Sequence, residues 1–296
     1  MASFLRKWFG GRPTPPPHLA AALAELETLA RDRPSLQTPC TVLGDILLEL
    51  FTEPVAESIP SLTTAAAHAK LADGTPLLRG IPLALDEKSF LRRWSAVCDA
   101  LKQPEAVALK TSALNPIMLL NEALAGRPEG VAVQAEALGL DPTLTGTMLR
   151  LCALPALSKI AAGLAALRQG ISWDYGFCPA CGSWPLLGET RGLEQQRFLR
   201  CGLCASAWEV SRFRCVYCGN EDHRSLGYFH VEGEENRQQA ATCDVCHGYL
   251  KVISTLGAFN EPRLLVTDLA TLYLDLTAAD RGFFIPAQNE DLSGAR

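Results

Sequence analysis

Four pairs of cysteines, each pair separated by two residues, are the residues of this chain whose type and spacing indicate chemistry. The pairs are Cys178/Cys181, Cys201/Cys204, Cys215/Cys218 and Cys243/Cys246. Two intervening residues let the backbone turn tightly, so both sulfurs face one ion and the amides of the turn can donate to them. Two such turns, here called knuckles and numbered first to fourth, complete a tetrahedral site of four thiolates. The sequence therefore predicts two metal ions held by eight cysteines.

The spacing leaves two ways of pairing the knuckles. Sequential pairing joins the first knuckle to the second and the third to the fourth, whereas cross-brace pairing joins the first to the third and the second to the fourth. We favour sequential pairing because β-prone segments lie inside each sequential loop. Gly182 and Gly219 directly follow the second cysteine of the first and third knuckles. Glycine accepts the positive φ expected at the end of such a turn.

The metal and its role stay open at this point. Zinc and iron both accept four thiolates, and zinc binds such sites more tightly than ferrous iron. A structural role is favoured over a redox or delivery role, because a short module needs ions in place of a core. Four thiolates around a divalent ion leave a charge of about -2. The arginines near the cysteines that could neutralise it are Arg197, Arg200, Arg212 and Arg214.

Composition limits the other classes of function. The chain has 296 residues with 48% hydrophobic residues and a net charge of -5, so it is globular and does not attract polyanions as a whole. No run of about 18 apolar residues occurs, which argues against membrane insertion. Residues 1–12 lack the apolar core of a signal peptide, so the expected location is the cytoplasm. Cytosolic thiols stay reduced, which favours metal binding over disulfides.

Hydrophobic periodicity predicts a helical front part. Stripes at helical spacing run through residues 19–30, Thr41–Phe51 and Glu87–Leu101. Asp141-Pro142 is typical of a helix start, and the helix it begins is expected to run toward Gly170, with Pro155 kinking or restarting it. The unpaired cysteines Cys40, Cys98 and Cys152 lie on apolar helical faces and are predicted to be core residues.

The pattern changes after Gly170, where helical stripes give way to short β-prone runs. These runs are Arg197–Arg200, Ala207–Phe213, Leu226–Val231 and Tyr249–Ser254. A last helix is expected from Glu261 to Ala278, with Leu264, Leu265, Leu269, Leu272 and Leu276 on its apolar face. The predicted fold class is α+β: a helical domain at 1–170, a metal-binding β module at 171–256, and a C-terminal helix and tail at 257–296.

Other chemistry finds little support. A thioredoxin-type redox pair needs one C-x-x-C at the start of a helix, whereas these pairs come in fours among short strands. His247 follows the fourth knuckle directly and is expected to face solvent or cap the turn, and two sites filled by eight sulfurs do not need His223 or His230. We find no phosphate-binding loop, dinucleotide fingerprint or nucleophile–base pair. The sequence thus predicts no catalytic residue and no enzyme.

The cysteine-rich region resembles the formate dehydrogenase accessory protein (FdhE) family over the last third of the chain. The match is carried by its four knuckles, the segments around them and part of the closing helix. The residues concerned are Cys178–Ser183, Arg197–Cys204, Trp208, Arg212, Cys215–Cys218, Cys243, Cys246, Gly248–Lys251 and Asp268–Leu272.

The resemblance implies properties that the spacing alone does not. The two sites would be rubredoxin-like, with iron as the expected metal and zinc as the alternative. The protein would act in maturation, like a chaperone, on the catalytic subunit of respiratory formate dehydrogenase. That subunit is exported folded, so the helper would work in the cytoplasm before export. Two alternatives remain: a zinc-ribbon nucleic-acid-binding protein, which the net charge makes the weaker reading, and a rubredoxin-type electron carrier.

Overall fold

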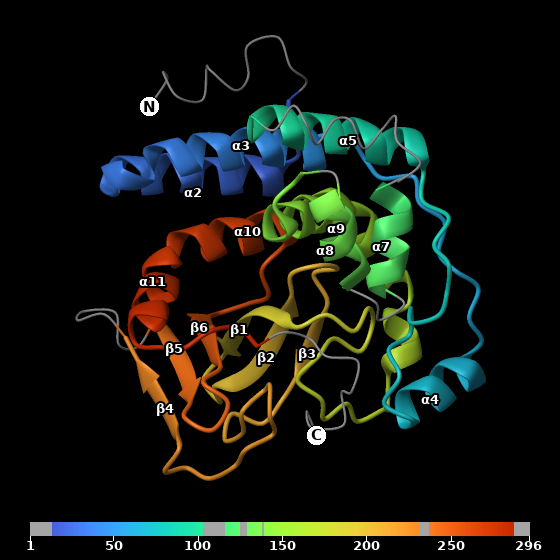
Figure 1. Cartoon of the computed structure of the whole chain (residues 1–296). Helices are drawn as coiled ribbons and strands as arrows, with labels where there is room; N and C mark the ends of the chain where they lie inside the picture. Colours follow the sequence, from blue (N-terminus) through green and yellow to red (C-terminus); the bar gives the residue numbers. More distant parts are fainter. Residues whose placement is uncertain (1–13, 103–115, 125–128, 138, 231–236, 287–296) are drawn as a thin grey trace. The chain divides into compact units, whose positions relative to one another are not determined.

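A computed structural model describes residues 14–102, 116–124, 129–137, 139–230 and 237–286 (Figure 1). These residues form helices and one six-stranded mixed sheet, which confirms the predicted α+β class with helices before and after a β-rich module. Within the described ranges, no helix is long and apolar enough to cross a membrane. Residues 1–12, which carried the expectation about an export signal, lie outside the described part.

The chain packs as two compact units, and each unit combines segments that are far apart in the sequence. The first unit comprises Met1–Ser58, Pro82–Lys159 and Asn260–Ala270. The second unit comprises Ile59–Ile81, Ile160–Phe259 and Thr271–Arg296. The predicted domains at 1–170, 171–256 and 257–296 describe the order of segments along the chain and stay a prediction.

The first unit is helical. Its elements are α2 (Pro17–Asp32), α3 (Gln37–Phe51), α5 (Glu87–Ala100), α7 (Pro116–Leu124), α8 (Glu129–Ala137), most of α9 (Pro142–Gly163) and α10 (Glu261–Ala270). Helices α2 and α3 run side by side and share a core with α10 (Figure 1). The predicted stripe at Leu19, Leu23, Leu26 and Ala30 is buried there, together with Cys40. On α5, the predicted face buries Phe90, Trp94 and Cys98.

Helix α9 begins where the sequence predicts and ends earlier. The Asp141 carboxylate accepts a 2.7 Å hydrogen bond from the amide of Leu144, as an N-cap should. The helix stops at Gly163, and a 3-10 turn (Ala165–Arg168) follows before Gly170. Pro155 lies inside α9, so the helix does not restart there, and the alternative expectation of a kink at Pro155 stays a prediction.

The second unit contains α4 (Thr64–Ala72), the sheet and α11 (Leu272–Asp280). The strands are β1 (Pro185–Arg191), β2 (Gln196–Cys201), β3 (Ala207–Glu209), β4 (Leu226–Phe229), β5 (Gln238–Cys243) and β6 (Tyr249–Thr255). Their order in the sheet is β3-β2-β1-β6-β5-β4. Neighbours are antiparallel except β1 and β6, which pair in parallel from Gly188↔Val252 to Arg191↔Thr255.

The sheet is thus two three-stranded antiparallel ribbons joined along β1 and β6. In each ribbon, a knuckle precedes the first two strands and a second knuckle separates the second strand from the third. The strand register is equivalent in the two ribbons: the first residue of the first strand pairs with the first cysteine of that ribbon's second knuckle. These pairs are Pro185 with Cys201 in one ribbon and Leu226 with Cys243 in the other. This repeat explains why the knuckles pair sequentially.

The closing helix differs from its prediction. The helix is interrupted at Thr271. The segment therefore forms two helices, α10 and α11, which belong to separate units, instead of one helix to Ala278. Helix α11 packs on β5 and β6 through Leu274 and Ala278. Leu276, expected on the apolar face, is 60% exposed, because the break at Thr271 changes which side of the helix meets the sheet.

Candidate metal centre

The first two knuckles bring four sulfurs together. Cys178 Sγ lies 3.6 Å from Cys204 Sγ, and Cys181 Sγ lies 3.4 Å from Cys201 Sγ. All four ligand atoms lie within 4.8 Å of one another. We call this group the first cluster.

The third and fourth knuckles form an equivalent group, the second cluster. Cys215 Sγ lies 3.6 Å from Cys246 Sγ, and Cys218 Sγ lies 3.7 Å from Cys243 Sγ, with all four sulfurs again within 4.8 Å. The sequential pairing of knuckles is therefore confirmed, and cross-brace pairing does not occur.

These distances fit a tetrahedral metal site. A metal–sulfur bond of about 2.3 Å gives sulfur–sulfur edges of about 3.8 Å in a tetrahedron. The cross-knuckle distances, 3.4 to 3.7 Å, are close to that edge. A disulfide needs about 2.0 Å, and all eight cysteines are free. The two clusters can hold two metal ions.

A repeated hydrogen-bond pattern holds every knuckle. The amide of the first cysteine donates to the carbonyl five residues later at 2.8 to 3.0 Å; the acceptors for the four knuckles in order are Ser183, Ser206, Asn220 and Gly248. The amides of Leu203 and Cys204 approach Cys201 Sγ at 3.4 Å. Such amide–sulfur contacts disperse thiolate charge, as expected for this kind of turn.

All four knuckles end in a residue with positive φ. The predicted glycines Gly182 (φ 87) and Gly219 (φ 71) serve the first and third knuckles. Ala205 (φ 54) and His247 (φ 53) take the same position in the second and fourth, although their side chains make this conformation less favourable. His247 is exposed and its ring is outside the cysteine cluster, in agreement with its expected role in the turn.

The thiols of each cluster perturb one another. Burial acts to raise the pKa of Cys178, but hydrogen bonds from the thiols of Cys181, Cys201 and Cys204 outweigh it and hold that pKa well below its ordinary value. Likewise, the adjacent Cys246 thiol lowers the pKa of Cys215 to about 5. Burial raises the pKa of Cys218 to about 11. Without an ion, each cluster thus favours few thiolates, and a cation is needed to stabilise four.

The first cluster is enclosed by packed groups. The amides of Leu77 and Leu78 donate to the carbonyls of Pro179 and Ala180 in the first knuckle, at 2.9 and 2.8 Å. Aromatic side chains from the segments that flank this knuckle pack together, and the Trp173 indole donates to the Phe177 carbonyl at 2.8 Å. The ring contacts join Trp173, Tyr175, Phe177, Trp184 and Tyr217.

The predicted arginines have different partners. Arg200 donates to the buried Glu189 carboxylate at 2.8 Å and to the Ala205 carbonyl at 3.1 Å, so it supports the second knuckle. Arg214 forms an ion pair with Asp174 at 2.8 Å. The charges of Arg200 and Arg214 are therefore paired with carboxylates, although both residues lie near cysteines in the sequence.

Arg197 is the arginine most closely associated with the second cluster. It is 7% exposed, and within the described residues its guanidinium forms no hydrogen bond or ion pair. Burial lowers the pKa of Arg197 to about 10, while Tyr217 and Cys215 act to raise it. With Arg212 and Arg214, Arg197 lines a cavity of about 60 Å³ that Cys215 and Cys243 also line.

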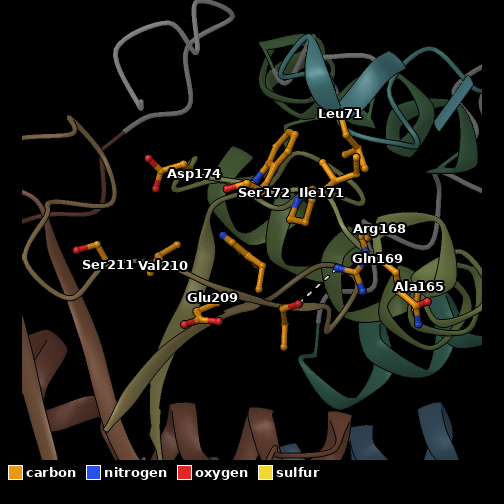
Figure 2. Close-up of a pocket in the computed structure, with 14 residues that line it drawn as sticks. Leu71, Ala165, Arg168, Gln169, Ile171, Ser172, Asp174, Glu209, Val210 and Ser211 are labelled. Atoms are coloured by element: carbon orange, nitrogen blue, oxygen red, sulfur yellow. Dashed lines mark hydrogen bonds between the residues drawn. The ribbon is translucent and has the colours of Figure 1, made fainter. Parts of the chain in front are cut away.

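A larger cleft of about 530 Å³ lies along β3 (Figure 2). Arg168 reaches across it to the Ala207 carbonyl at 3.4 Å, shown as a dashed line in Figure 2. Trp173 and Trp208 line the cleft, and Asp174 and Glu209 give its lining negative as well as positive charge. No sequence pattern pointed to this cleft, because its lining comes from four separate segments.

The fold and the clusters define a class: a protein with a helical unit and tandem β ribbons, each with one cluster of four cysteines that can hold a metal ion. Residues 177–212 match the family model described as "FdhE, central domain", and residues 213–291 match "FdhE, C-terminal domain". The boundary between these matches separates the two ribbons, so each family domain contains one cluster.

Comparisons that cover more than two thirds of the chain identify the family. The chain is 33% identical over 217 residues to the FdhE homolog of Stutzerimonas stutzeri (strain A1501), covering 70% of this chain and 69% of the relative. It is 30% identical over 244 residues to the homolog of Edwardsiella ictaluri (strain 93-146), covering 79% and 74%. The chain belongs to the FdhE family, as the sequence motifs predicted.

Other comparisons agree. A match to the FdhE homolog of Aquifex aeolicus (strain VF5) has 37% identity over 123 residues but covers only 40% of this chain and 42% of that protein. The crystal structure of the FdhE protein from Pseudomonas aeruginosa has the same fold, with a TM-score of 0.65 and 24% identity over 93% of this chain and 96% of that chain.

Proposed function

We propose that this chain is an accessory protein for the maturation of respiratory formate dehydrogenase, and that it binds the catalytic subunit in the cytoplasm before export. Family membership supports an accessory role. The observation that carries the proposal is the pair of complete tetracysteine clusters inside the two matched FdhE domains.

The eight cysteines are proposed as the ligands of two metal ions, with iron expected and zinc as the alternative. Each ribbon is short, so bonds from an ion to two knuckles would supply folding energy. We propose that the main role of the ions is structural. A redox role would come in addition to this structural role. We assign no catalytic residue to the chain.

The structure supports the two alternative functions, nucleic-acid binding and electron transfer, to different extents. Nucleic-acid binding needs a basic face, but Arg200 and Arg214 near the knuckles are engaged by Glu189 and Asp174. A rubredoxin-type electron carrier needs an ion near the surface, and the partial exposure of Cys218 and Cys246 favours it more. Reversible reduction of bound iron would support that alternative.

A deletion strain tests the accessory role. We expect loss of formate dehydrogenase activity with unchanged transcript of the catalytic subunit, and restoration by the intact gene. A gene carrying Cys243→Ser and Cys246→Ser should fail to restore activity, while Cys98→Ala should restore it, because Cys98 lies outside both clusters and alanine adds no polar group to the helical core. Normal enzyme activity in the deletion strain would contradict the proposal.

Direct binding is the second part of the test. Purified tagged chain should retain the catalytic subunit from cytoplasmic extract, and the double variant Cys243→Ser, Cys246→Ser should retain much less. Equal recovery with both proteins would show that the fourth knuckle is not needed for the partner.

A further inference from the structure

The two clusters are enclosed to different degrees. All four cysteines of the first cluster are buried, whereas Cys218 and Cys246 of the second are partly exposed to solvent. The remaining two cysteines of the second cluster, Cys215 and Cys243, line the cavity of about 60 Å³. Every cysteine of the second cluster therefore borders either solvent or a cavity.

The groups that hold the first cluster in place are themselves buried. Two backbone hydrogen bonds from Leu77 and Leu78 fix the first knuckle. The buried Glu189 holds Arg200, which in turn fixes the Ala205 carbonyl at the end of the second knuckle. These packed groups must separate before an ion can leave this cluster. A chelator therefore reaches the sulfurs of the first cluster only after a larger local unfolding than the second cluster needs.

Charge distinguishes the clusters as well. Near the first cluster, Arg200 already has the carboxylate of Glu189. Near the second, the buried Arg197 has no Asp or Glu partner among the described residues, and the groups whose negative charge would act on it are Tyr217 and Cys215, which line the same cavity. A divalent ion with four thiolates carries about -2. The loaded second cluster thus provides the counter-charge that Arg197 otherwise lacks.

We propose that the second cluster exchanges its metal ion, that the first keeps its ion, and that Arg197 stabilises the loaded second cluster through its charge. The inference rests on the proposed function only in assuming that both clusters bind a thiophilic divalent cation. In exchange, an incoming chelator forms a bond to the ion as the Cys218 or Cys246 thiolate leaves and takes up a proton. No oxidation or reduction is involved.

The proposed exchange gives the two sites distinct tasks. The first ion maintains the ribbon that contains β1, β2 and β3. The second ion can be loaded, removed or replaced while that ribbon stays folded. The accessory protein would therefore have a metal-dependent state in its C-terminal family domain, and the presence of the second ion would set the structure that this domain presents.

Chelator competition tests the proposal with the full-length chain loaded with two zinc ions. Mixing with excess 4-(2-pyridylazo)resorcinol should release one ion quickly and the other slowly. Iodoacetamide added after the fast phase, followed by mass spectrometry, should label Cys215, Cys218, Cys243 and Cys246 and leave the first cluster unlabelled. This mapping uses the unaltered protein and so does not depend on a variant that folds.

Arg197 is tested by substitution. Arg197→Gln should speed the fast phase about tenfold, since one nearby charge at an intermediate dielectric has an effect of at least that size. Arg197→Lys should restore most of the slower rate. The exposed Arg224→Gln in the same unit is the control and should leave both phases unchanged. An unchanged rate in Arg197→Gln would remove Arg197 from the account.

The outcomes separate this inference from the proposed function. Release of both ions at one rate, or early labelling of the first cluster, would overturn the inference and leave the accessory role standing. A chain that binds no zinc or iron at all would contradict both.

Discussion

The backbone amide of Leu77 donates a 2.9 Å hydrogen bond to the carbonyl of Pro179, inside the first knuckle. A segment that precedes the cysteine-rich region by many residues is therefore part of the support of the first cluster. Leu77 and Leu78 are both completely buried.

Replacing Leu77 with alanine should destabilise the metal-binding unit. Loss of a fully buried leucine costs about 2–5 kcal/mol because a cavity remains, and here it also loosens the segment that holds the knuckle. Urea unfolding of the zinc-loaded protein should show the loss. The control is Leu193→Ala, since Leu193 is fully exposed; similar destabilisation in both variants would contradict the role given to Leu77.

Glu189 is predicted to make a large contribution to the stability of the sheet. It is completely buried, accepts from Arg200 at 2.8 Å and Arg191 at 2.7 Å, and also accepts from the Phe259 amide at 3.2 Å. Glu189→Gln removes the shared negative charge and should lower the free energy of unfolding by about 3–5 kcal/mol.

An ion pair with one exposed partner gives the comparison for Glu189. The Arg214 side chain is 11% exposed, but the Asp174 side chain that pairs with it is 68% exposed. Asp174→Asn should cost only about 0–1 kcal/mol in the same denaturation experiment, because solvent screens the exposed Asp174 carboxylate. Equal losses for the two substitutions would show that burial does not decide their contributions.

Because the last residue of each knuckle has a positive φ, two substitutions at this position should change stability in opposite directions. His247→Gly should raise the melting temperature, because glycine relieves roughly 1 kcal/mol of strain at φ 53. Gly219→Ala should lower the melting temperature, because alanine at φ 71 introduces strain of a similar size. Differential scanning calorimetry of the loaded proteins measures both, and a shift of the same sign in the two variants would refute the explanation.

The clusters could be predicted from the sequence because ligand spacing is local. Two residues between cysteines determine the turn, and the β-prone runs inside each loop indicated which knuckles pair. Helices with clear stripes, such as α2 and α5, were predicted for the same reason: each apolar face repeats within a few residues.

The parts that were missed depend on distant partners. Strand β1 has Gly188 and Glu189 near its centre, and a buried glutamate suits a strand only when Arg200 and Arg191 pair with it. Strand β5 (Gln238–Cys243) is rich in glutamine and alanine, which gives little β signal. The contribution of Leu77 to the first knuckle and the break at Thr271 likewise depend on packing across the fold.

The cysteines should differ in their reaction with iodoacetamide once the metal is stripped. Burial raises the pKa of Cys40 and Cys152, so at pH 8 they remain protonated and react slowly. The neighbouring Cys246 thiol lowers the pKa of Cys215 to about 5, so Cys215 should stay a thiolate as the pH falls from 8 to 6.

Mass spectrometry of tryptic peptides after short labelling at each pH measures this difference. Labelling of Cys215 should change little between pH 6 and pH 8, while labelling of Cys40 and Cys152 should stay low and increase only at higher pH. Rapid labelling of Cys152 in the folded protein at pH 8 would contradict its burial in the helical core.

X-ray absorption spectroscopy of anaerobically purified protein, combined with metal analysis, tests the central claim most directly. The account predicts two ions per chain, each surrounded by four sulfurs at about 2.3 Å. Fewer than two ions in fully reduced protein, or a first shell containing nitrogen or oxygen in place of some sulfurs, would contradict it.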